Sequence, residues 1–273
     1  MSGNVPAGIN PDIPNVARMY DYYLGGRDNF ASDRAAAEKI IELGRQMGND
    51  AREIARANRA FLGRAVGSLA ATGIRQFLDI GAGLPTQDNV HQVAKRHATD
   101  SRVAYVDNDP VVLNHARALL ARDSDVITVE GDLRDADAIF DNPDITSHLD
   151  FSRPIAVLLV AILHFVPDND EAAGIVGQVK KRLRPGDYLV LSHVSAGTTT
   201  QRDAQEGQRV YSATTSGGIA HRGYAEIFPY FDGLELLPPG LVPVADWKPA
   251  VPPGPDTDFD RPGILGAVAR VPG

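Results

Sequence analysis

The sequence predicts an α/β protein with a doubly wound, mostly parallel sheet. From residue 77 onward, short runs rich in Val, Ile and Leu alternate with longer segments of helical periodicity. The first run breaks into a glycine turn, Gly81 to Gly83, where the main chain can approach a ligand closely. The first three runs carry acids at or near their ends: Asp79, Asp107 and Asp132. Open α/β sheets bind ligands at the carboxyl ends of their strands, so we expect the functional site there.

The composition is that of an ordinary globular protein and narrows the possible partners. The 273 residues are 43% hydrophobic and 23% charged, which allows one large domain or two small ones. The net charge of −8 creates no basic field to gather phosphates, so nucleic acid is not expected as a partner. No apolar run approaches the roughly 18 residues needed to span a bilayer, so no membrane association is expected.

Targeting and metal-binding signals are also missing from the sequence. The first 15 residues show neither the basic nor the apolar region of a secretion signal, which predicts a cytoplasmic location. With no cysteine, the chain has neither a disulfide framework nor thiolate chemistry. The seven histidines show no H-x-x-x-H or H-E-x-x-H spacing, so no metal site is predicted.

The N-terminal region predicts a helical lid. The chain turns helical after Ser32 or Asp33, which we expect as N-caps, and a second helix is expected over about residues 51–70. Three prolines in the first 14 residues favour an extended or disordered tail. We therefore divide the chain into a tail (1–14), a helical lid packed on the main domain (15–72) and an α/β domain (73–273).

The α/β domain is expected to alternate strands and helices in chain order. After the strand at residue 77, the expected strands are 102–107, 126–132, 154–163 and 188–193. One helix is expected to start at Pro110, and three more are expected over about 135–140, 168–183 and 223–231. The polar segment 195–221 is long for a plain connection, so we expect an insertion that faces the substrate. Two strand-like runs near the end, with no helix between them, predict antiparallel pairing.

The glycine turn predicts a nucleotide-type ligand but disfavours NAD. Thr86 occupies the third glycine position of the dinucleotide fingerprint, and Asp79 stands where an NAD-binding strand is usually apolar. Asp107 follows the turn at the ~20-residue spacing of a ribose-binding acid. Asp132 and Leu133, after the third strand, are placed to meet an adenine amino group.

These motifs together resemble a known enzyme class. D-I-G-A-G at 79–83, Y-V-D-N-D at 105–109 and G-D-L at 131–133 resemble class I S-adenosylmethionine-dependent methyltransferases, and L-H-F-V-P-D at 163–168 is similar to a motif of the small-molecule enzymes. The segments 18–30 and 58–66 resemble a bacterial S-adenosyl methyltransferase family of mostly unassigned substrate. The resemblance implies a Rossmann-like fold with a mostly parallel seven-stranded sheet and a terminal antiparallel strand, and S-adenosyl-L-methionine as cofactor.

The resemblance also implies roles for individual residues. Gly81 and Gly83 would line the methionine part of the cofactor, Asp107 would hold the ribose, and Asp132 and Leu133 would frame the adenine. Asp79 could attract a ligand ammonium group. Further candidates for contact with the cofactor are Asn108, Arg18, Tyr20 and Tyr23. The alternatives are a tight turn without ligand for the glycines, helix N-caps for the acids and ordinary packing for the tyrosines.

The acceptor side is less defined by the sequence. His164 and His193 end neighbouring predicted strands and could face one cleft, where a histidine could remove the acceptor proton. His164 is our preferred general base, although positioning alone can drive methyl transfer. Tyr211 and His221 are further candidates for binding the substrate. The alternative for each histidine is a hydrogen-bonded residue at the rim.

The sequence therefore predicts an S-adenosylmethionine-dependent methyltransferase that acts on an oxygen or nitrogen of a small molecule. The alternatives are a non-enzymatic cofactor-binding protein and, less favoured, an NAD-dependent oxidoreductase. The oligomeric state is not predicted.

Overall fold

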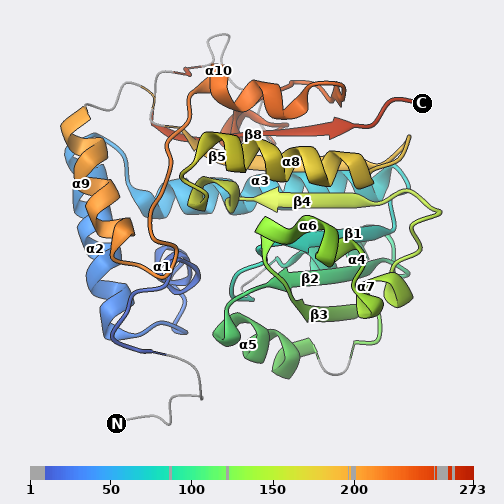
Figure 1. Cartoon of the computed structure of the whole chain (residues 1–273), viewed down its shortest axis with the longest axis horizontal. Coiled ribbons are helices and arrows are strands. Elements are labelled where there is room, and N and C mark those ends of the chain that lie inside the picture. The colour runs from blue at the N-terminus through green and yellow to red at the C-terminus, as the bar shows by residue number, and fades with distance from the viewer. Residues whose placement is uncertain are drawn as a thin grey trace.

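A single sheet with helices on both faces forms the body of the protein (Figure 1). The computed structural model describes residues 10–85, 88–120, 123–195, 197, 201–248, 250, 258–259 and 262–273. The strands are β1 (Gln76–Ile80), β2 (Arg102–Asp107), β3 (Val126–Glu130), β4 (Ala156–Val160), β5 (Tyr188–Ser195), β6 (Glu235–Leu236), β7 (Val242–Pro243) and β8 (Gly263–Arg270). Thr86, the residue that argues against NAD, lies outside the described residues.

The strand order confirms the predicted fold class. Seven strands follow the order β3-β2-β1-β4-β5-β8-β6, and the two-residue β7 pairs with β8 off this path. The first five strands pair in parallel, whereas β8 runs antiparallel to β5, β6 and β7. The antiparallel pairing predicted for the end of the chain is therefore present, although β6 and β7 have only two residues each.

The helices alternate with these strands and also precede them. They are α1 (Val16–Tyr23), α2 (Ala31–Gln46), α3 (Ala51–Ala71), α4 (Val90–His97), α5 (Pro110–Leu120), α6 (Ala136–Phe140), α7 (Pro143–His148), α8 (Asn169–Arg182), α9 (Gln201–Ser212) and α10 (Tyr224–Ile227). Short 3-10 turns are η1 (Leu133–Asp135), η2 (Leu163–Phe165), η3 (Phe228–Phe231) and η4 (Val244–Asp246). No helix in the described part of the chain is long and apolar enough to cross a membrane.

The central strands are apolar because both faces of the sheet are covered. Every residue of β1 and β4 is buried, as expected for parallel strands with helices on either side. The residues expected to form one lid, 15–72, pack in two different ways. Phe61, Leu62 and Val66 of α3 join the core on one face of the sheet, whereas Met19, Ala37 and Ile41 of α1 and α2 form a separate small cluster.

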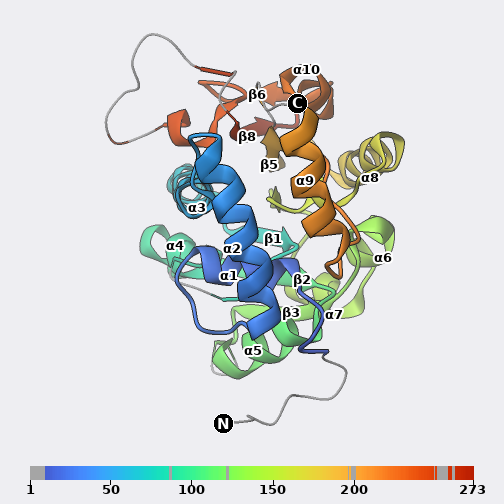
Figure 2. The same cartoon turned by 90° about the vertical axis from the view of Figure 1, so that its left-hand side faces the viewer.

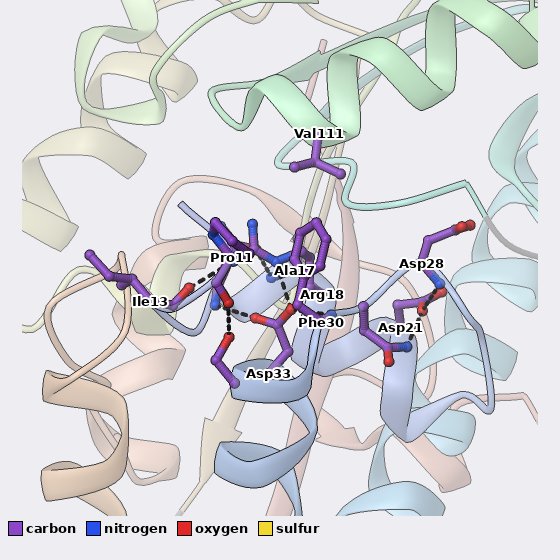
Figure 3. Close-up of polar contacts among 12 residues, drawn as sticks. Pro11, Ile13, Ala17, Arg18, Asp21, Asp28, Phe30, Asp33 and Val111 are labelled. Atoms are coloured by element: carbon purple, nitrogen blue, oxygen red, sulfur yellow. Dashed lines mark hydrogen bonds and ion pairs between the residues drawn. The ribbon is translucent and has the colours of Figure 1, made fainter. Parts of the chain in front are cut away.

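Helix α2 begins earlier than the sequence predicted. Its first residue is Ala31 and its N-cap is Phe30, so the N-caps predicted at Ser32 or Asp33 were wrong. Asp33 lies in the first turn, where its carboxylate accepts from the backbone N–H of Phe30 (2.7 Å) and of Asn15 (2.8 Å) and from Arg18 Nε (2.8 Å). Figure 3 shows this arrangement. Asp33 therefore makes one local capping contact, with the N-cap residue Phe30, and two tertiary contacts, which local capping preferences cannot anticipate.

Helices α1, α2 and α9 lie at the end of the sheet where β4 ends (Figure 1), and Figure 2 shows them from that side. Two hydrogen bonds join the start of α1 to the segment that follows α9. Asn15 Nδ2 donates to Thr215 Oγ1 (3.0 Å), and the backbone N–H of Thr215 donates to Pro14 O (3.0 Å). The N-terminal helices thus meet α9 and the residues that follow it over the carboxyl ends of the strands.

Candidate active site

A cavity of about 540 Å³ lies at the carboxyl ends of β1, β2 and β3. Its size is in the range of ~300–1,000 Å³ typical of ligand pockets. Most residues predicted to bind the cofactor line this cavity, which we call the first cavity: Arg18, Tyr20, Asp79, Gly81, Gly83, Asp107, Asn108, Asp132 and Leu133. The exception is Tyr23, which lies elsewhere.

The two glycines of the turn are needed for different reasons. Gly81 has a φ of +76°, and a Cβ at this position would meet the Ile162 side chain at 2.4 Å. Gly83 has a φ of +66°, which side-chain-bearing residues rarely adopt, but a Cβ there would meet no atom within 4 Å. The turn therefore approaches the segment after β4 at Gly81 and leaves open space beside Gly83.

Asp107 holds the turn in place and still has acceptor capacity. Its Oδ2 accepts from the backbone N–H of Gly83 (2.9 Å) and its Oδ1 from that of Asp109 (2.9 Å). Helix α5 is capped by Asp109, whose Oδ1 accepts from Val111 N (2.7 Å), so Asp107 is not the cap. A carboxylate has about four acceptor sites, and the backbone of Asn108 also donates to Asp107, which leaves about one site for a ligand. Burial raises the pKa of Asp107.

Asp79 is a buried acid beside the first cavity. Burial is the main cause that raises its pKa to about 7; the charge of Asp107 acts in the same direction and that of Arg59 opposes it. Arg59 comes from α3 and lines the cavity, and its Nη2 donates to Asn89 Oδ1 (2.7 Å). Arg59 lies in the segment 58–66 that resembles the family, but no role in the site was assigned to it, because only the packing of α3 against the sheet brings it to this place.

Asp132 is a cap and a cavity residue at once. Its Oδ1 accepts from the backbone N–H of Arg134 (2.9 Å) and so caps η1, as the alternative interpretation had it. The side chain is nevertheless exposed at the cavity wall, next to the buried Leu133. Capping and ligand contact therefore do not exclude each other here.

Arg18 and Tyr20 reach the first cavity from α1. Arg18 is buried, and its guanidinium is held by Asp33 and by Ile13 O, to which Nη2 donates (2.8 Å), so much of its hydrogen-bonding capacity serves the N-terminal segment (Figure 3). The hydroxyl of Tyr20 donates to Ala55 O (3.1 Å) and accepts from Asn58 Nδ2 (3.0 Å).

A second cavity of about 160 Å³ adjoins the first. It is lined by five of the residues singled out in the sequence: Tyr20, Tyr23, His164, Tyr211 and His221. The hydroxyls of Tyr23 and Tyr211 lie 3.4 Å apart. Four residues line both cavities and form the wall between them: Val16, Tyr20, Ala161 and Phe165.

The two histidines expected in one cleft have different surroundings, although their ring centroids are 5.5 Å apart. His193 lies fully buried on β5 and lines neither cavity. Its Nδ1 donates to Val194 O (2.8 Å) and its Nε2 accepts from Arg222 Nη1 (2.8 Å), so both ring nitrogens are used. Burial lowers the pKa of His193 to about 3. This environment is that of a packed structural residue.

In the described part of the chain, the ring of His164 makes fewer hydrogen bonds than that of His193. It lies in η2 after β4, and among the described residues its Nδ1 is buried without a hydrogen-bond partner. Burial is the main cause that lowers the pKa of His164 well below its usual value, and His193, His221 and Arg222 add to this effect. The imidazole is therefore uncharged near neutral pH and able to accept a proton.

A chain of hydrogen bonds supports the wall between the cavities. Ala161 has a φ of +57°, and its backbone N–H donates to Ser192 Oγ (3.0 Å). Ser192 Oγ donates to Asn58 Oδ1 (2.7 Å), and Asn58 Nδ2 donates to Tyr20. We call Tyr20, Asn58, Ser192 and Ala161 the wall relay. Nothing in the sequence singled out Asn58 or Ser192 for this role.

Comparison with known proteins identifies the family. Residues 2–272 match a family described as S-adenosyl methyltransferase. The chain belongs to this S-adenosyl methyltransferase family. No curated protein matches it. The resemblance inferred from the motifs is thereby confirmed, and the cofactor is S-adenosylmethionine.

Two solved structures are similar along nearly the whole chain. One is a candidate methyltransferase from Thermobifida fusca YX, with a TM-score of 0.88, 37% identity and coverage of 98% of this chain and 99% of that one. The other is a duf574 family protein from Streptomyces avermitilis, with a TM-score of 0.85, 40% identity and coverage of 96% and 100%. The family match favours a methyltransferase over an oxidoreductase.

Among the described residues of this methyltransferase, no group of three or more His, Asp or Glu side chains could hold a metal ion.

Proposed function

We propose that the protein transfers the methyl group of S-adenosylmethionine to an oxygen or nitrogen of a small molecule held in the second cavity. The observation that carries this proposal is the shared wall. Tyr20, Ala161 and Phe165 line both cavities, so a cofactor in the first would lie next to an acceptor in the second.

The residues of the first cavity fit the cofactor by their chemistry. The remaining acceptor capacity of Asp107 suits a ribose hydroxyl, and Leu133 with Asp132 suits an adenine ring and its amino group. The ionised form of Asp79 suits an ammonium group, and the open space beside Gly83 suits a chain that runs along the turn. Together these groups cover the adenosyl and amino-acid ends of the molecule.

When bound, S-adenosylmethionine supplies an electrophilic methyl group on a sulfonium. The protein contributes position, exclusion of water and a proton acceptor. The aromatic faces of Tyr20 and Phe165 stabilise a nearby cation without reacting with it, and uncharged His164 can take up the proton that the acceptor loses. The N-terminal helices and Thr215 cover the site from the outside.

Titration calorimetry with S-adenosylhomocysteine tests this function. We expect saturable binding to the full chain, and we expect Asp107→Ala to weaken it at least about tenfold, because the variant loses charge-assisted hydrogen bonds. The matched control is Asp170→Ala, an exposed acid on α8 that lines neither cavity. Absence of binding to the unmodified chain would refute the proposal.

A further inference from the structure

The second cavity differs from the first in charge. The described lining of the second cavity contains no Asp, Glu, Lys or Arg side chain. The first cavity, in contrast, is lined by eight such residues: Arg18, Asp21, Arg59, Asp79, Asp107, Asp109, Asp132 and Arg134. The two neighbouring cavities thus offer very different environments to a ligand.

The histidines of the second cavity do not supply a charge either. Burial lowers the pKa of both His164 and His221, so both imidazoles are uncharged near neutral pH. Arg222, whose charge acts on His164, is buried and donates to Val166 O, Asp168 O and Asn169 Oδ1 as well as to His193. A charged acceptor would therefore lose its hydration without gaining a counter-ion, which is strongly unfavourable.

The size and lining of the second cavity suit one aromatic ring. An apolar protein cavity of ~150 Å³ binds benzene, and this cavity measures about 160 Å³. Its walls carry four aromatic side chains, from Tyr20, Tyr23, Phe165 and Tyr211. Most of the rest is aliphatic, including Ile40, Leu43, Met47, Ile54, Ile219 and Ile264. Aromatic rings stack on one another in offset or edge-to-face arrangements, which favours a ring over an aliphatic chain of equal volume.

The uncommitted imidazole of His164 indicates which reacting group fits. A buried histidine with a lowered pKa is a weak base, so it assists acidic hydroxyls more than ordinary alcohols. A phenolic hydroxyl has a pKa of about 10, as in tyrosine. We propose that the second cavity binds an uncharged, single-ring phenol, with its hydroxyl directed to His164. This inference rests on the proposed function, because it names the acceptor of the same methyl transfer.

The transfer balances without a further reactant. The phenol oxygen forms a bond to the methyl carbon, the bond from that carbon to sulfur breaks, and its electron pair stays on sulfur. The hydroxyl proton passes to the His164 imidazole and then to solvent. The positive charge thus moves from the sulfonium to the imidazolium, and no net charge is created in the buried site. The products are a methyl aryl ether and S-adenosylhomocysteine.

Matched phenols test the proposal with the full chain and saturating S-adenosylmethionine at neutral pH. Phenol and para-cresol are the uncharged probes, whereas para-hydroxybenzoate and tyramine carry one negative and one positive charge. Ether formation is followed by mass spectrometry. We expect kcat/KM for the uncharged probes to exceed that for the charged ones by about 100-fold or more, because the charged ring must give up its hydration.

A second measurement separates acceptor binding from turnover. Gly207 of α9 lines the second cavity, and a Cβ there meets no atom within 4 Å, so Gly207→Leu is expected to occupy the space. The control is Gly174→Leu on α8, which also has open space but lines neither cavity. In saturation-transfer NMR on the complex with S-adenosylhomocysteine, para-cresol should bind to the unmodified chain and to the control but not to Gly207→Leu.

The outcomes are distinguishable. If S-adenosylhomocysteine does not bind to the unmodified chain, the proposed function fails and this inference fails with it. If it binds, but the uncharged phenols neither bind nor react, or the charged probes react equally well, only the phenol proposal is overturned. Equal binding of para-cresol to Gly207→Leu would also overturn it, since the ring would then lie elsewhere.

Discussion

At the scale of single residues, the burial of the Asp79 carboxyl lowers the stability of the folded protein when this group is ionised. A buried carboxylate is disfavoured in its charged form, which is why the pKa of Asp79 rises from 3.8 to about 7. The folded protein therefore binds this proton more tightly than the unfolded chain does. Stability is lost as the pH rises from about 4 to about 7, and the deficit is complete above that range.

We predict that Asp79→Asn raises the stability of the ligand-free protein at alkaline pH. The free energy of unfolding should increase by at most ~4 kcal/mol at pH 8, which is the free-energy equivalent of the rise in the pKa of Asp79. This increase should shrink to nearly zero below pH 4. Thermal unfolding between pH 4 and pH 8 measures it. The same variant should bind S-adenosylhomocysteine about tenfold more weakly, because an amide lacks the charge that attracts an ammonium group.

The exposed acid Asp170 of α8 provides the control for Asp79. Asp170→Asn should leave both the pH dependence of unfolding and the affinity for S-adenosylhomocysteine nearly unchanged. If Asp79→Asn had the same stability as the unmodified chain at every pH and bound S-adenosylhomocysteine with the same affinity, Asp79 would have neither effect described above.

At the scale of elements, the wall relay connects four segments at the junction of the cavities. Tyr20 is on α1, Asn58 on α3, Ser192 on β5, and Ala161 directly after β4. Asn58 and Ser192 are almost fully buried, so their hydrogen bonds have no water to replace them. The left-handed backbone of Ala161 is a conformation that needs such support.

We predict that Asn58→Ala lowers kcat while largely preserving the affinity for S-adenosylhomocysteine. The variant leaves Ser192 Oγ without its acceptor and frees one side of Tyr20, which loosens the wall that positions the reacting groups. Stability should fall by about 1–3 kcal/mol, as for a buried polar group that loses its partner. Single-turnover kinetics and calorimetry separate the two effects.

Arg56→Ala, on the exposed face of the same helix, is the control for Asn58. Its kcat and stability should stay close to those of the unmodified chain. A normal kcat for Asn58→Ala, accompanied only by lower stability, would show that the wall relay serves folding and not positioning.

At the scale of the whole molecule, two segments far apart in the sequence cover the strand ends together. Asn15 and Thr215 are hydrogen-bonded across 200 positions, and Tyr23 approaches Tyr211. On the other side, Ala17 packs against a cluster that contains Leu84 of the glycine turn and Val111 of α5. Asp28 Oδ2 also lies 3.7 Å from Nδ1 of His115 on α5. The first cavity therefore has α1 as one of its walls, and a ligand in it would bridge α1 and the sheet.

We predict that ligand binding slows hydrogen exchange in the N-terminal segment. Backbone amides of residues 15–31 should exchange at least about tenfold more slowly with S-adenosylhomocysteine bound, because opening of this segment then requires loss of ligand contacts. Amides of β4 in the core provide the internal control and should change little. Exchange in residues 15–31 that is insensitive to the ligand would show that this segment does not act as a lid.

Several elements were predictable because their signals are local. The strand 102–107 was predicted with the bounds that β2 has, and Pro110 marks the first residue of α5. The polar stretch that contains α9 was recognised as unusual from its length alone. By contrast, the N-cap predicted at Ser32 or Asp33 is Phe30, and the carboxylate of Asp33 accepts from the backbone of Phe30 as well as from Arg18 and Asn15.

The residues of the candidate site also divide into those that local sequence signals predict and those that tertiary contacts decide. Asp79, Gly81, Gly83, Asp107 and Asp132 could be selected from sequence because each lies at a strand end, where parallel sheets gather residues from consecutive strands. His164 was preferred over His193 as the base, and of the two only His164 lines a cavity, whereas the ring of His193 accepts a hydrogen bond from Arg222.

The amino-acid order by itself determined the sheet, the glycine turn and the acids of the cofactor cavity, since these depend on residue types at short spacing. Tertiary structure alone decided that α3 contributes Arg59 and Asn58 to the site and that a second, uncharged cavity lies beside the first. The physical reason is distance along the chain. Asn58 meets Ser192 across 134 positions, and only the packing of α3 on the sheet brings the two side chains together.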